Sequence, residues 1–253
     1  MNDWKGRRVL ITGANRGIGE VFARAAARAG AHVYAHGRTL DRLAALRKEI
    51  DLVPIEAELS DPAAAGQIRE QLGDNPLDAL INNAAFEIKA PLAEFPNDQL
   101  EAIIRVDLLF PMELSRALLP NLQIGRNPCI VHVTSIHDTV PARGNSPYAI
   151  AKAGLLMHTR SAAIEFAPLG IRVNALAPGA IETDMNREAI QTIGPENFKR
   201  WIPAGRIGRA EELVDAFLFL AGPASTYTTG ARLCVDGGYE HHLLRYPMED
   251  RVR

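Results

Sequence analysis

The chain has 253 residues, of which 47% are hydrophobic and 23% charged, and its formal net charge at neutral pH is −2. A chain of this length and composition can bury a sizeable core without disulfides or bound metals. Its nearly balanced charge gives no general attraction for nucleic acid or an anionic membrane, so we expect neither as a partner. No apolar run approaches the ~18 residues of a membrane span, and the start, "MNDWKGRRVLITG", lacks the pattern of a signal peptide.

The two cysteines, Cys129 and Cys234, lie in the apolar runs "NPCIVHV" and "ARLCVDGG". Residues of this kind in predicted strands are typical of buried free thiols rather than of a disulfide. We therefore expect a cytoplasmic protein in a reducing compartment, and we expect no metal site.

Predicted strands and helices alternate along the chain. The predicted strands are short apolar or β-branched runs, at 7–13, 31–37, 52–59, 77–85, 129–135, 171–179 and 231–238. The predicted helices have apolar residues at helical spacing, at 18–30, 40–50, 62–72, 97–122, 145–168 and 210–222. This alternation predicts one α/β domain over 1–253, a doubly wound, Rossmann-like parallel sheet of about seven strands with helices on both faces.

Three places depart from this regular alternation. Pro111 interrupts the long helical pattern 97–122 and predicts a kink there. The segment 182–208 is long and poorly periodic, as lids and binding loops often are. Residues 241–253 form a charged tail that either frays or packs on a neighbouring subunit.

A glycine-rich turn, "TGANRGIG" (12–19), joins the first predicted strand to the first predicted helix. Glycines at 13, 17 and 19 permit a tight turn and let a ligand come close to the backbone. The free N–H groups and the positive dipole at the start of the helix suit a pyrophosphate. The turn therefore predicts a dinucleotide site, although its spacing differs from the usual G-x-G-x-x-G.

The end of the second predicted strand, "YAHGR", indicates which dinucleotide binds. Many dinucleotide folds place an acid there to bind the ribose 2′-hydroxyl. This chain has Gly37 at that position, followed by Arg38, and Arg16 adds a second positive charge in the glycine turn. A guanidinium can bind a 2′-phosphate that a carboxylate would repel. The sequence therefore favours NADP over NAD, with NAD still possible.

The stretch "SPYAIAKAG" (146–154) places Tyr148 and Lys152 one turn apart on the same face of a predicted helix. A free tyrosine has a pKa near ~10, and an ammonium group beside it favours the phenolate and lowers that pKa. A phenol tuned in this way can give a proton to an alkoxide or take one from an alcohol. Ser135, at the end of the fifth predicted strand, is placed to hold the substrate oxygen against the phenol.

Ser135 could instead act as the nucleophile of a hydrolase. That chemistry would need a histidine base and the sharp turn of a G-x-S-x-G motif, which "HVTSIHD" lacks. His132 alternates with apolar neighbours and is better explained as a core residue, and His137 as a residue of the pocket wall or surface. We therefore do not adopt the hydrolase hypothesis.

Taken together, these motifs resemble those of the short-chain dehydrogenase/reductase family, in family order, from about Lys5 to Tyr239. The glycine-rich turn "TGANRGIG" (12–19) resembles the family's TGxxxGIG turn. Ser135 resembles its catalytic serine, and Tyr148 with Lys152 resembles its YxxxK pair. Three further segments are similar to family motifs: "NNAA" (82–85), "PGAIET" (178–183) and "VDGGY" (235–239).

The resemblance implies reversible hydride transfer between NAD(P)(H) and a carbonyl or secondary alcohol of the 3-oxoacyl, ketone, sugar or polyol type. It implies that Tyr148 is the general acid/base, that Lys152 lowers the Tyr148 pKa and binds ribose, and that Ser135 orients the substrate. The cofactor contacts that it implies are Gly13, Asn15, Arg16, Gly17, Ile18, Gly19, Arg38, Glu58, Leu59, Asn83, Ala84, Tyr148, Lys152, Pro178, Gly179, Ile181 and Thr183. It also implies a substrate-binding lid at 184–208, and a homotetramer or homodimer paired through the helices near 97–122 and 145–168.

Three residues differ from the family pattern. Ala85 replaces a glycine, which the turn should tolerate unless that residue needs positive φ. Glu58 is one methylene longer than the usual aspartate. Asp107 stands where the family has the asparagine of its catalytic tetrad, and its charge could offset part of the help that Lys152 gives to Tyr148. Asp107 is the one feature that favours an alternative function, a catalytically weak dinucleotide-binding sensor or scaffold.

Overall fold

The computed structural model describes residues 4–183 and 186–242. Its main sheet has seven parallel strands in the order β3-β2-β1-β4-β5-β6-β9. These strands are β1 (Arg8–Ile11), β2 (His32–Gly37), β3 (Leu52–Glu56), β4 (Ala79–Asn82), β5 (Cys129–Val133), β6 (Arg172–Pro178) and β9 (Arg232–Val235). The chain runs outward from β1 to β3 and then crosses to β4, so the direction of winding reverses between β1 and β4. The predicted doubly wound sheet is confirmed.

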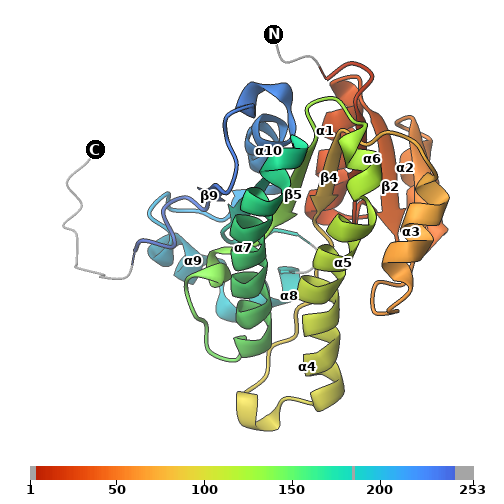
Figure 1. Cartoon of the computed structure of the whole chain (residues 1–253). Coiled ribbons are helices and arrows are strands. Elements are labelled where there is room, and N and C mark those ends of the chain that lie inside the picture. The colour runs from red at the N-terminus through yellow and green to blue at the C-terminus, as the bar shows by residue number, and fades with distance from the viewer. Residues whose placement is uncertain (1–3, 184–185, 243–253) are drawn as a thin grey trace, which may run out of the picture.

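Helices cover both faces of this sheet (Figure 1). One face packs against α1 (Gly17–Arg28), α2 (Leu40–Arg47) and α10 (Val214–Ala221). The other packs against α3 (Ala64–Leu72), α5 (Phe110–Ala117), α6 (Leu119–Gln123) and α7 (Ser146–Phe166). Successive side chains of a strand point to opposite faces of the sheet, so each strand contributes to both layers. Val9 is fully buried in the apolar cluster on the first face, and Leu10 is fully buried in the cluster on the second. The two clusters hold the strands rigid, so that the loops at their carboxyl ends have fixed positions.

The predicted helix 97–122 is not continuous. It consists of α4 (Asn97–Ile104), a π-helical turn (Arg105–Leu109), α5 and α6. Proline has no N–H, so Pro111 cannot donate the usual bond to the carbonyl four residues earlier, which is that of Asp107. The N–H of Phe110 instead bonds to the carbonyl of Arg105, five residues back. The predicted kink is therefore a widened turn, and Asp107 lies within it.

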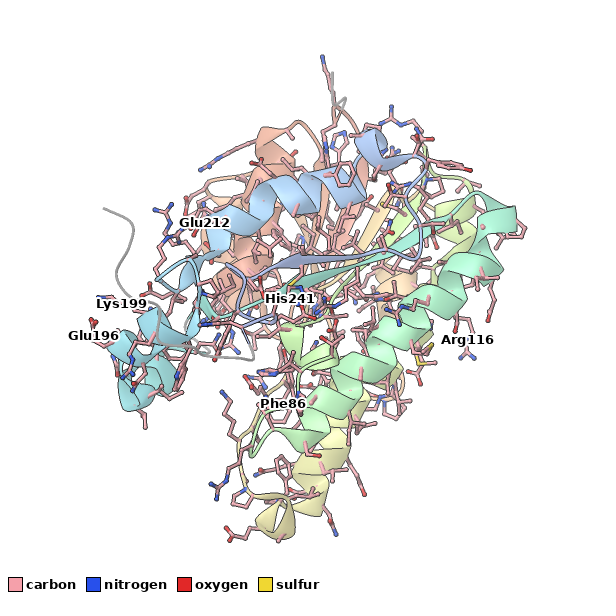
Figure 2. All side chains as sticks on the ribbon, turned by 90° about the vertical axis from the view of Figure 1, so that its left-hand side faces the viewer. Phe86, Arg116, Glu196, Lys199, Glu212 and His241 are labelled. Carbon is pink, nitrogen blue, oxygen red and sulfur yellow. The ribbon has the colours of Figure 1, made fainter. Side chains whose placement is uncertain are left out.

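The segment 182–208 is more regular than its sequence predicts. It contains α8 (Arg187–Ile193) and α9 (Pro195–Trp201), while β7 (Ile181–Glu182) pairs with β8 (Gly208–Arg209) and joins its two ends. Helices of about two turns are too short to show a clear apolar period, which is why the sequence pattern looks irregular. Figure 2 labels Glu196 and Lys199 on α9, which lies on a different side of the molecule from α4. Residues 184–185 of the predicted lid lie outside the described residues.

Short 3-10 turns complete the fold. They are Leu92–Glu94, Ile136–Asp138, Ala167–Leu169, Ala210–Leu213 and Pro223–Ser225. The fourth forms the start of the predicted helix 210–222, so α10 begins at Val214. Of the predicted tail, residues 243–253 lie outside the described part of the chain.

Both cysteines are free thiols. Cys129 is fully buried in β5, as predicted, whereas Cys234 in β9 is only partly buried. Within residues 4–183 and 186–242, no helix combines the length and hydropathy that a membrane crossing requires.

Candidate functional site

The glycine turn between β1 and α1 is shaped by contacts that exclude side chains. Gly13 and Gly17 have φ of +65° and +56°, the left-handed region that glycine adopts at no cost. A Cβ on Gly19 would lie 2.3 Å from the carbonyl oxygen of Gly13, so only glycine fits there. Helix α1 begins at Gly17 with no side-chain cap, which leaves its first amides available to an anion.

His36, which the sequence analysis did not single out, fixes this turn from β2. Its Nδ1 accepts a hydrogen bond of 3.2 Å from the N–H of Gly13, so the ring proton lies on Nε2, 3.1 Å from the carbonyl oxygen of Ala57. The ring is 2% exposed, and burial lowers the pKa of His36. A neutral imidazole therefore ties the glycine turn to the loop after β3. Its only sequence signal is a histidine within an apolar strand, which is typical of core residues.

The end of β2 matches the predicted preference for a phosphate. A Cβ on Gly37 would lie 3.1 Å from Leu43 Cδ1 and 3.3 Å from Asn15 Cβ, so glycine fits this position best and any side chain there would have to displace these neighbours slightly. Arg38 and Arg16 are both exposed, and neither forms an ion pair with another described residue. Two uncommitted guanidinium groups thus flank the glycine turn.

The "NNAA" turn after β4 is anchored to the end of β1. The hydroxyl oxygen of Thr12 accepts hydrogen bonds of 3.0 Å from the N–H groups of both Asn83 and Ala84. The Asn83 side chain donates to the Thr12 carbonyl at 2.9 Å. Ala85 does not have positive φ, so alanine is tolerated in place of glycine, as predicted. These bonds hold the strand ends on the two sides of the winding reversal together.

Two predicted cofactor contacts lie after β3. The carboxylate of Glu58 is exposed and accepts hydrogen bonds from the backbone and the hydroxyl of Ser60, at 3.3 and 3.0 Å. Leu59 is buried in the core. Glu58 therefore has a local role in its own loop, and its longer side chain does not point to an ion-pair partner among the described residues.

The segment after β6 reaches back to the glycine turn. Pro178 ends β6, and the N–H of Gly179 bonds to the Val235 carbonyl at 3.0 Å. Further along, Thr183 lies next to the start of α1, because a Cβ on Gly17 would be only 3.6 Å from Thr183 Cγ2. The structure thus brings residues 178–183 and the turn at 12–19 to one place.

Ser135 begins a 3-10 turn two residues beyond β5. Its Oγ accepts a hydrogen bond of 3.1 Å from the N–H of His137, and its side chain is also hydrogen-bonded to that of Tyr148. The His137 ring packs edge-on to the Tyr148 ring, with 6.3 Å between centroids. His137 is therefore a wall residue beside the phenol, as predicted. His132 is fully buried and lies 3.1 Å from the Asn82 amide nitrogen, which confirms it as a core residue.

Lys152 lies one turn after Tyr148 on α7 and is 1% exposed. Its Nζ lies 5.3 Å from the centroid of the Tyr148 ring and donates a hydrogen bond of 3.3 Å to the carbonyl of Val133. Asp107 approaches from the π-helical turn, with Oδ2 3.2 Å from Lys152 Nζ. The structure therefore joins Ser135, Tyr148, Lys152 and Asp107 in one cluster.

Asp107 is held from two directions. Its Oδ1 accepts a hydrogen bond of 2.7 Å from the N–H of Phe86, and its Oδ2 faces Lys152. The carboxyl group is 0% exposed, and burial raises its pKa while the Lys152 ammonium opposes the rise. A carboxylate and an ammonium group thus face each other in one buried site, where each is the other's charge partner.

The prediction that the pKa of Tyr148 is lowered is wrong for this structure. The pKa of Tyr148 lies well above its usual value, first because the phenol is buried and then because of the negative charges of Asp107 and Glu87. The hydrogen bond with Ser135 acts in the opposite direction. The negative charge of Asp107, which lies 3.2 Å from Lys152 Nζ, acts in the direction that the sequence suggested.

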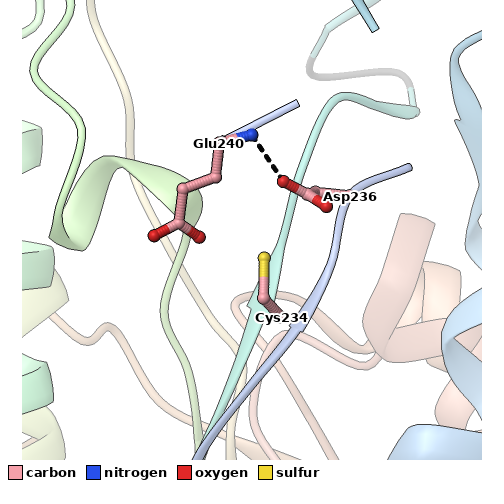
Figure 3. Close-up of side chains that lie close together, drawn as sticks. All are labelled: Cys234, Asp236 and Glu240. Atoms are coloured by element: carbon pink, nitrogen blue, oxygen red, sulfur yellow. Dashed lines mark hydrogen bonds between the residues drawn. The ribbon is translucent and has the colours of Figure 1, made fainter. Parts of the chain in front are cut away.

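A charged network fixes the turn that carries Ser135. Arg232 of β9 binds both oxygens of Asp138 through its Nε, at 2.9 and 3.0 Å, and its Nη2 lies 2.8 Å from Glu240 Oε2. Figure 3 shows Glu240 beside Cys234 and Asp236, whose possible ligand atoms all lie within 4.8 Å of one another. Asp236 accepts the N–H of Glu240 at 2.6 Å, so both carboxylates already have protein partners.

The comparisons with known proteins agree with this geometry. A family model described as enoyl-(acyl carrier protein) reductase matches residues 13–240. Glucose 1-dehydrogenase of Gluconobacter oxydans is 35% identical, over 92% of this chain and 91% of that protein. The 3-oxoacyl-acyl-carrier-protein reductase of Escherichia coli is 34% identical, over 93% of this chain and 98% of that protein.

Solved structures show the same fold over nearly the whole chain. A gluconate 5-dehydrogenase from Burkholderia cenocepacia, in complex with NADP and tartrate, has a TM-score of 0.89 at 30% identity, covering 95% of this chain and 98% of that one. A short-chain type dehydrogenase/reductase from Mycobacterium marinum has a TM-score of 0.87 at 30% identity, covering 94% and 96%. With the glycine turn, the YxxxK pair and these full-length matches in agreement, the chain belongs to the short-chain dehydrogenase/reductase family.

Proposed function

We propose that this protein catalyses reversible hydride transfer between NADP(H) and a carbonyl or secondary alcohol, with Tyr148 as general acid/base. The observation that carries the proposal is the cluster in which Tyr148, hydrogen-bonded to Ser135, lies above the buried ammonium of Lys152. Relatives at 34–35% identity are named as dehydrogenases and reductases, which agrees with an enzyme and not with the sensor or scaffold alternative. Their names cover sugars and 3-oxoacyl groups, within the range of substrates that the sequence suggested.

In the reduction direction, the chain's task is to deliver a proton to the substrate oxygen. Bound NADPH supplies the hydride. The hydroxyl of Ser135 donates a hydrogen bond to the carbonyl oxygen, and Tyr148 transfers its phenolic proton to that oxygen as negative charge develops. The phenol of Tyr148 is protonated at neutral pH, as the acid role in reduction requires. Lys152 binds the ribose and stabilises the phenolate that remains.

Asp107 takes part as a positioning residue rather than as a proton donor to substrate. Its carboxylate fixes the Lys152 ammonium and, through the N–H of Phe86, the loop after β4. The negative charge also raises the Tyr148 pKa. Asp107 thus favours the protonated phenol, the form that donates the proton in reduction.

The residues around the glycine turn fit a dinucleotide that carries a 2′-phosphate. The cradle is free of side chains at Gly13, Gly17 and Gly19, and position 37 holds glycine rather than an acid that would repel the phosphate. Arg38 and Arg16 would bind the 2′-phosphate. The remaining cofactor contacts that we propose are Asn15, Ile18, Glu58, Leu59, Asn83, Ala84, Tyr148, Lys152, Pro178, Gly179, Ile181 and Thr183.

The proposal also covers domain organisation, compartment and oligomeric state. The chain acts as one domain, in which the segment from β7 to β8 closes over the substrate. The free thiols of Cys129 and Cys234 suit a reducing cytoplasm. A dimer or tetramer forms through α7 and α5, where Ile150, Met157 and Ile164 recur every seven residues and are more than half exposed.

A panel of carbonyls and alcohols, followed by the absorbance of reduced nicotinamide, tests the activity. Calorimetric titration with NADPH and NADH tests the cofactor, on the wild type and on Arg38→Ala. Loss of a bidentate phosphate contact should weaken NADPH binding by about tenfold or more and leave NADH binding nearly unchanged. Binding without turnover of any panel member would restore the sensor hypothesis, and preference for NADH would overturn the role of Arg38.

A further inference from the structure

The carboxylate of Glu87 lies beside the catalytic cluster with one oxygen uncommitted. Its Oε1 accepts a hydrogen bond of 2.7 Å from the side-chain amide of Asn145 and lies 3.5 Å from Lys89 Nζ. No described residue donates a hydrogen bond to Oε2. The Glu87 side chain as a whole is only 12% exposed, so most of it is packed against protein.

The neighbours of Glu87 hold it firmly in place. Phe86 donates its N–H to Asp107, and the N–H of Ala90 bonds to the Gly144 carbonyl at 3.0 Å. Asn145, which is 0% exposed, is the residue before the first turn of α7. The carboxylate is therefore preorganised, and binding a ligand would cost little further ordering.

Glu87 is also close to the place where a proton is transferred. Asn145, to which it is hydrogen-bonded, lies at the start of α7, three residues before Tyr148. In agreement with this position, the negative charge of Glu87 raises the pKa values of both Tyr148 and Asp107. Phe86, its neighbour in the chain, contacts Asp107 directly. The loop after β4 and the start of α7 therefore bring Glu87 to the side of the site that holds Tyr148 and Asp107.

We propose that Glu87 Oε2 accepts hydrogen bonds from hydroxyl groups next to the reacting carbon, so that the substrate is a sugar or polyol. The inference rests on the proposed oxidoreductase function and narrows its substrate class. An ionised carboxylate can only accept hydrogen bonds, and hydroxyl groups supply the donors that it lacks. The chain of a 3-oxoacyl group has no hydrogen-bond donor there, and would cover the carboxylate without forming a hydrogen bond to it.

Lys89 offers the competing explanation, because its ammonium could attract an anionic substrate. The Lys89 side chain is half exposed, and its Nζ forms an ion pair of 3.5 Å with Glu87 Oε1. The Glu87 side chain is the more buried of the two. Of these two groups, it is the Glu87 carboxylate that has an oxygen, Oε2, without a protein partner among the described residues, and this oxygen accepts hydrogen bonds. The observations therefore favour a hydroxyl-rich, uncharged substrate over an acid.

Two ketones that differ by a single hydroxyl group test this assignment. The test measures NADPH-dependent reduction of 2-hydroxycyclohexanone and of cyclohexanone by the full chain, as a ratio of kcat/KM values. A hydrogen bond to a charged acceptor should favour the hydroxylated ketone by about 10- to 100-fold in the wild type. Glu87→Ala should bring the ratio close to one, and Glu87→Gln, which can still accept from Asn145, should give an intermediate ratio.

Glu70→Gln is the matched control, because it removes one exposed carboxylate from α3 and should leave the ratio unchanged. Thermal melting and NADPH titration of each variant show that it is folded. A wild-type ratio near one, or a ratio that survives Glu87→Ala, would overturn the inference and leave the proposed function intact. Preference for a keto acid that is lost in Lys89→Ala but kept in Glu87→Ala would overturn it as well. NADPH binding without reduction of either ketone or of any panel member would refute the proposed function and, with it, this inference.

Discussion

Asp107 Oδ2 lies 3.2 Å from Lys152 Nζ, and both side chains are shielded from solvent by the π-helical turn and α7. The ion pair exists because Asp107 stands where the family pattern has an asparagine. It bears on the protonation of Tyr148, because the carboxylate, after burial of the phenol, raises the Tyr148 pKa. The proton chemistry of this site therefore depends on a residue that itself exchanges no proton with the substrate.

The Asp107→Asn variant should shift the pH dependence of alcohol oxidation. Oxidation requires the phenolate, so kcat/KM rises with pH through the Tyr148 pKa, which Asp107 holds high. Removal of that negative charge lowers the Tyr148 pKa and should move the rise to lower pH by about one unit. The measurement is kcat/KM for a secondary alcohol against pH, in the wild type and the variant.

Glu70→Gln again serves as the charge control and should leave the pH profile of oxidation in place. An unchanged profile in Asp107→Asn, or a shift toward higher pH, would show that Asp107 does not act on the phenol. Reduction gives a second readout, because it needs the protonated phenol. Its decline at alkaline pH should begin earlier in Asp107→Asn.

Gly19→Ala should abolish NADPH binding or prevent folding, whereas Gly66→Ala should be harmless. The added Cβ would lie 2.3 Å from the Gly13 carbonyl oxygen in the first case and would meet no atom within 4 Å in the second. Alanine in the interior of α3 should stabilise the protein by about 0.5 to 1 kcal/mol relative to glycine. Chemical denaturation and NADPH titration of both variants check this. Normal cofactor affinity in Gly19→Ala would refute the proposed role of the turn.

The arrangement of the sheet and the cluster of Ser135, Tyr148 and Lys152 could be predicted because local patterns encode them. Apolar runs alternate with helical periods, the glycine turn and Ser135 lie at the ends of predicted strands, and the YxxxK pair lies on a predicted helix. The π-helical turn could not be predicted in detail, although Pro111, four residues after Asp107, marks its position. Contacts such as Asn145 with Glu87, 58 residues apart in sequence, depend on how loops meet in space.

The stability of the protein should fall with pH below about 6.5, in part through His36. The pKa of His36 is lowered in the folded state, so the unfolded chain takes up a proton first. The stability from neutral His36 is complete above the unfolded pKa and is lost as pH falls toward the folded one. This loss is at most about 1.4 kcal/mol per pH unit for one group.

The comparison that isolates His36 is urea unfolding of the wild type and His36→Asn above and below that pH. The variant should show a smaller drop, because the asparagine side chain does not titrate. His132, whose pKa is lowered well below its usual value by burial, should account for part of the remaining drop. An equal drop in both proteins would show that His36 is not held neutral by the glycine turn.

Met157→Glu should reduce the mass of the protein in solution. Met157 is 57% exposed at the middle of the apolar row on α7, and a carboxylate there would be buried without a partner in a helix-paired dimer. Light scattering after gel filtration measures the mass. Leu40→Glu on α2, a residue 44% exposed on a different helix, is the control and should leave the mass unchanged. A monomeric wild type would refute the proposed pairing.

The most direct test of the central claim is NADPH oxidation by the wild type and by Tyr148→Phe, in the presence of a ketone that the wild type reduces. Phenylalanine keeps the ring that packs against His137 and removes only the proton that is transferred. The account predicts that NADPH binding is retained while kcat falls by about 1,000-fold, within the range for loss of general acid catalysis. A variant that binds NADPH and still reduces the ketone at the wild-type rate would contradict the assignment of Tyr148 as the proton donor.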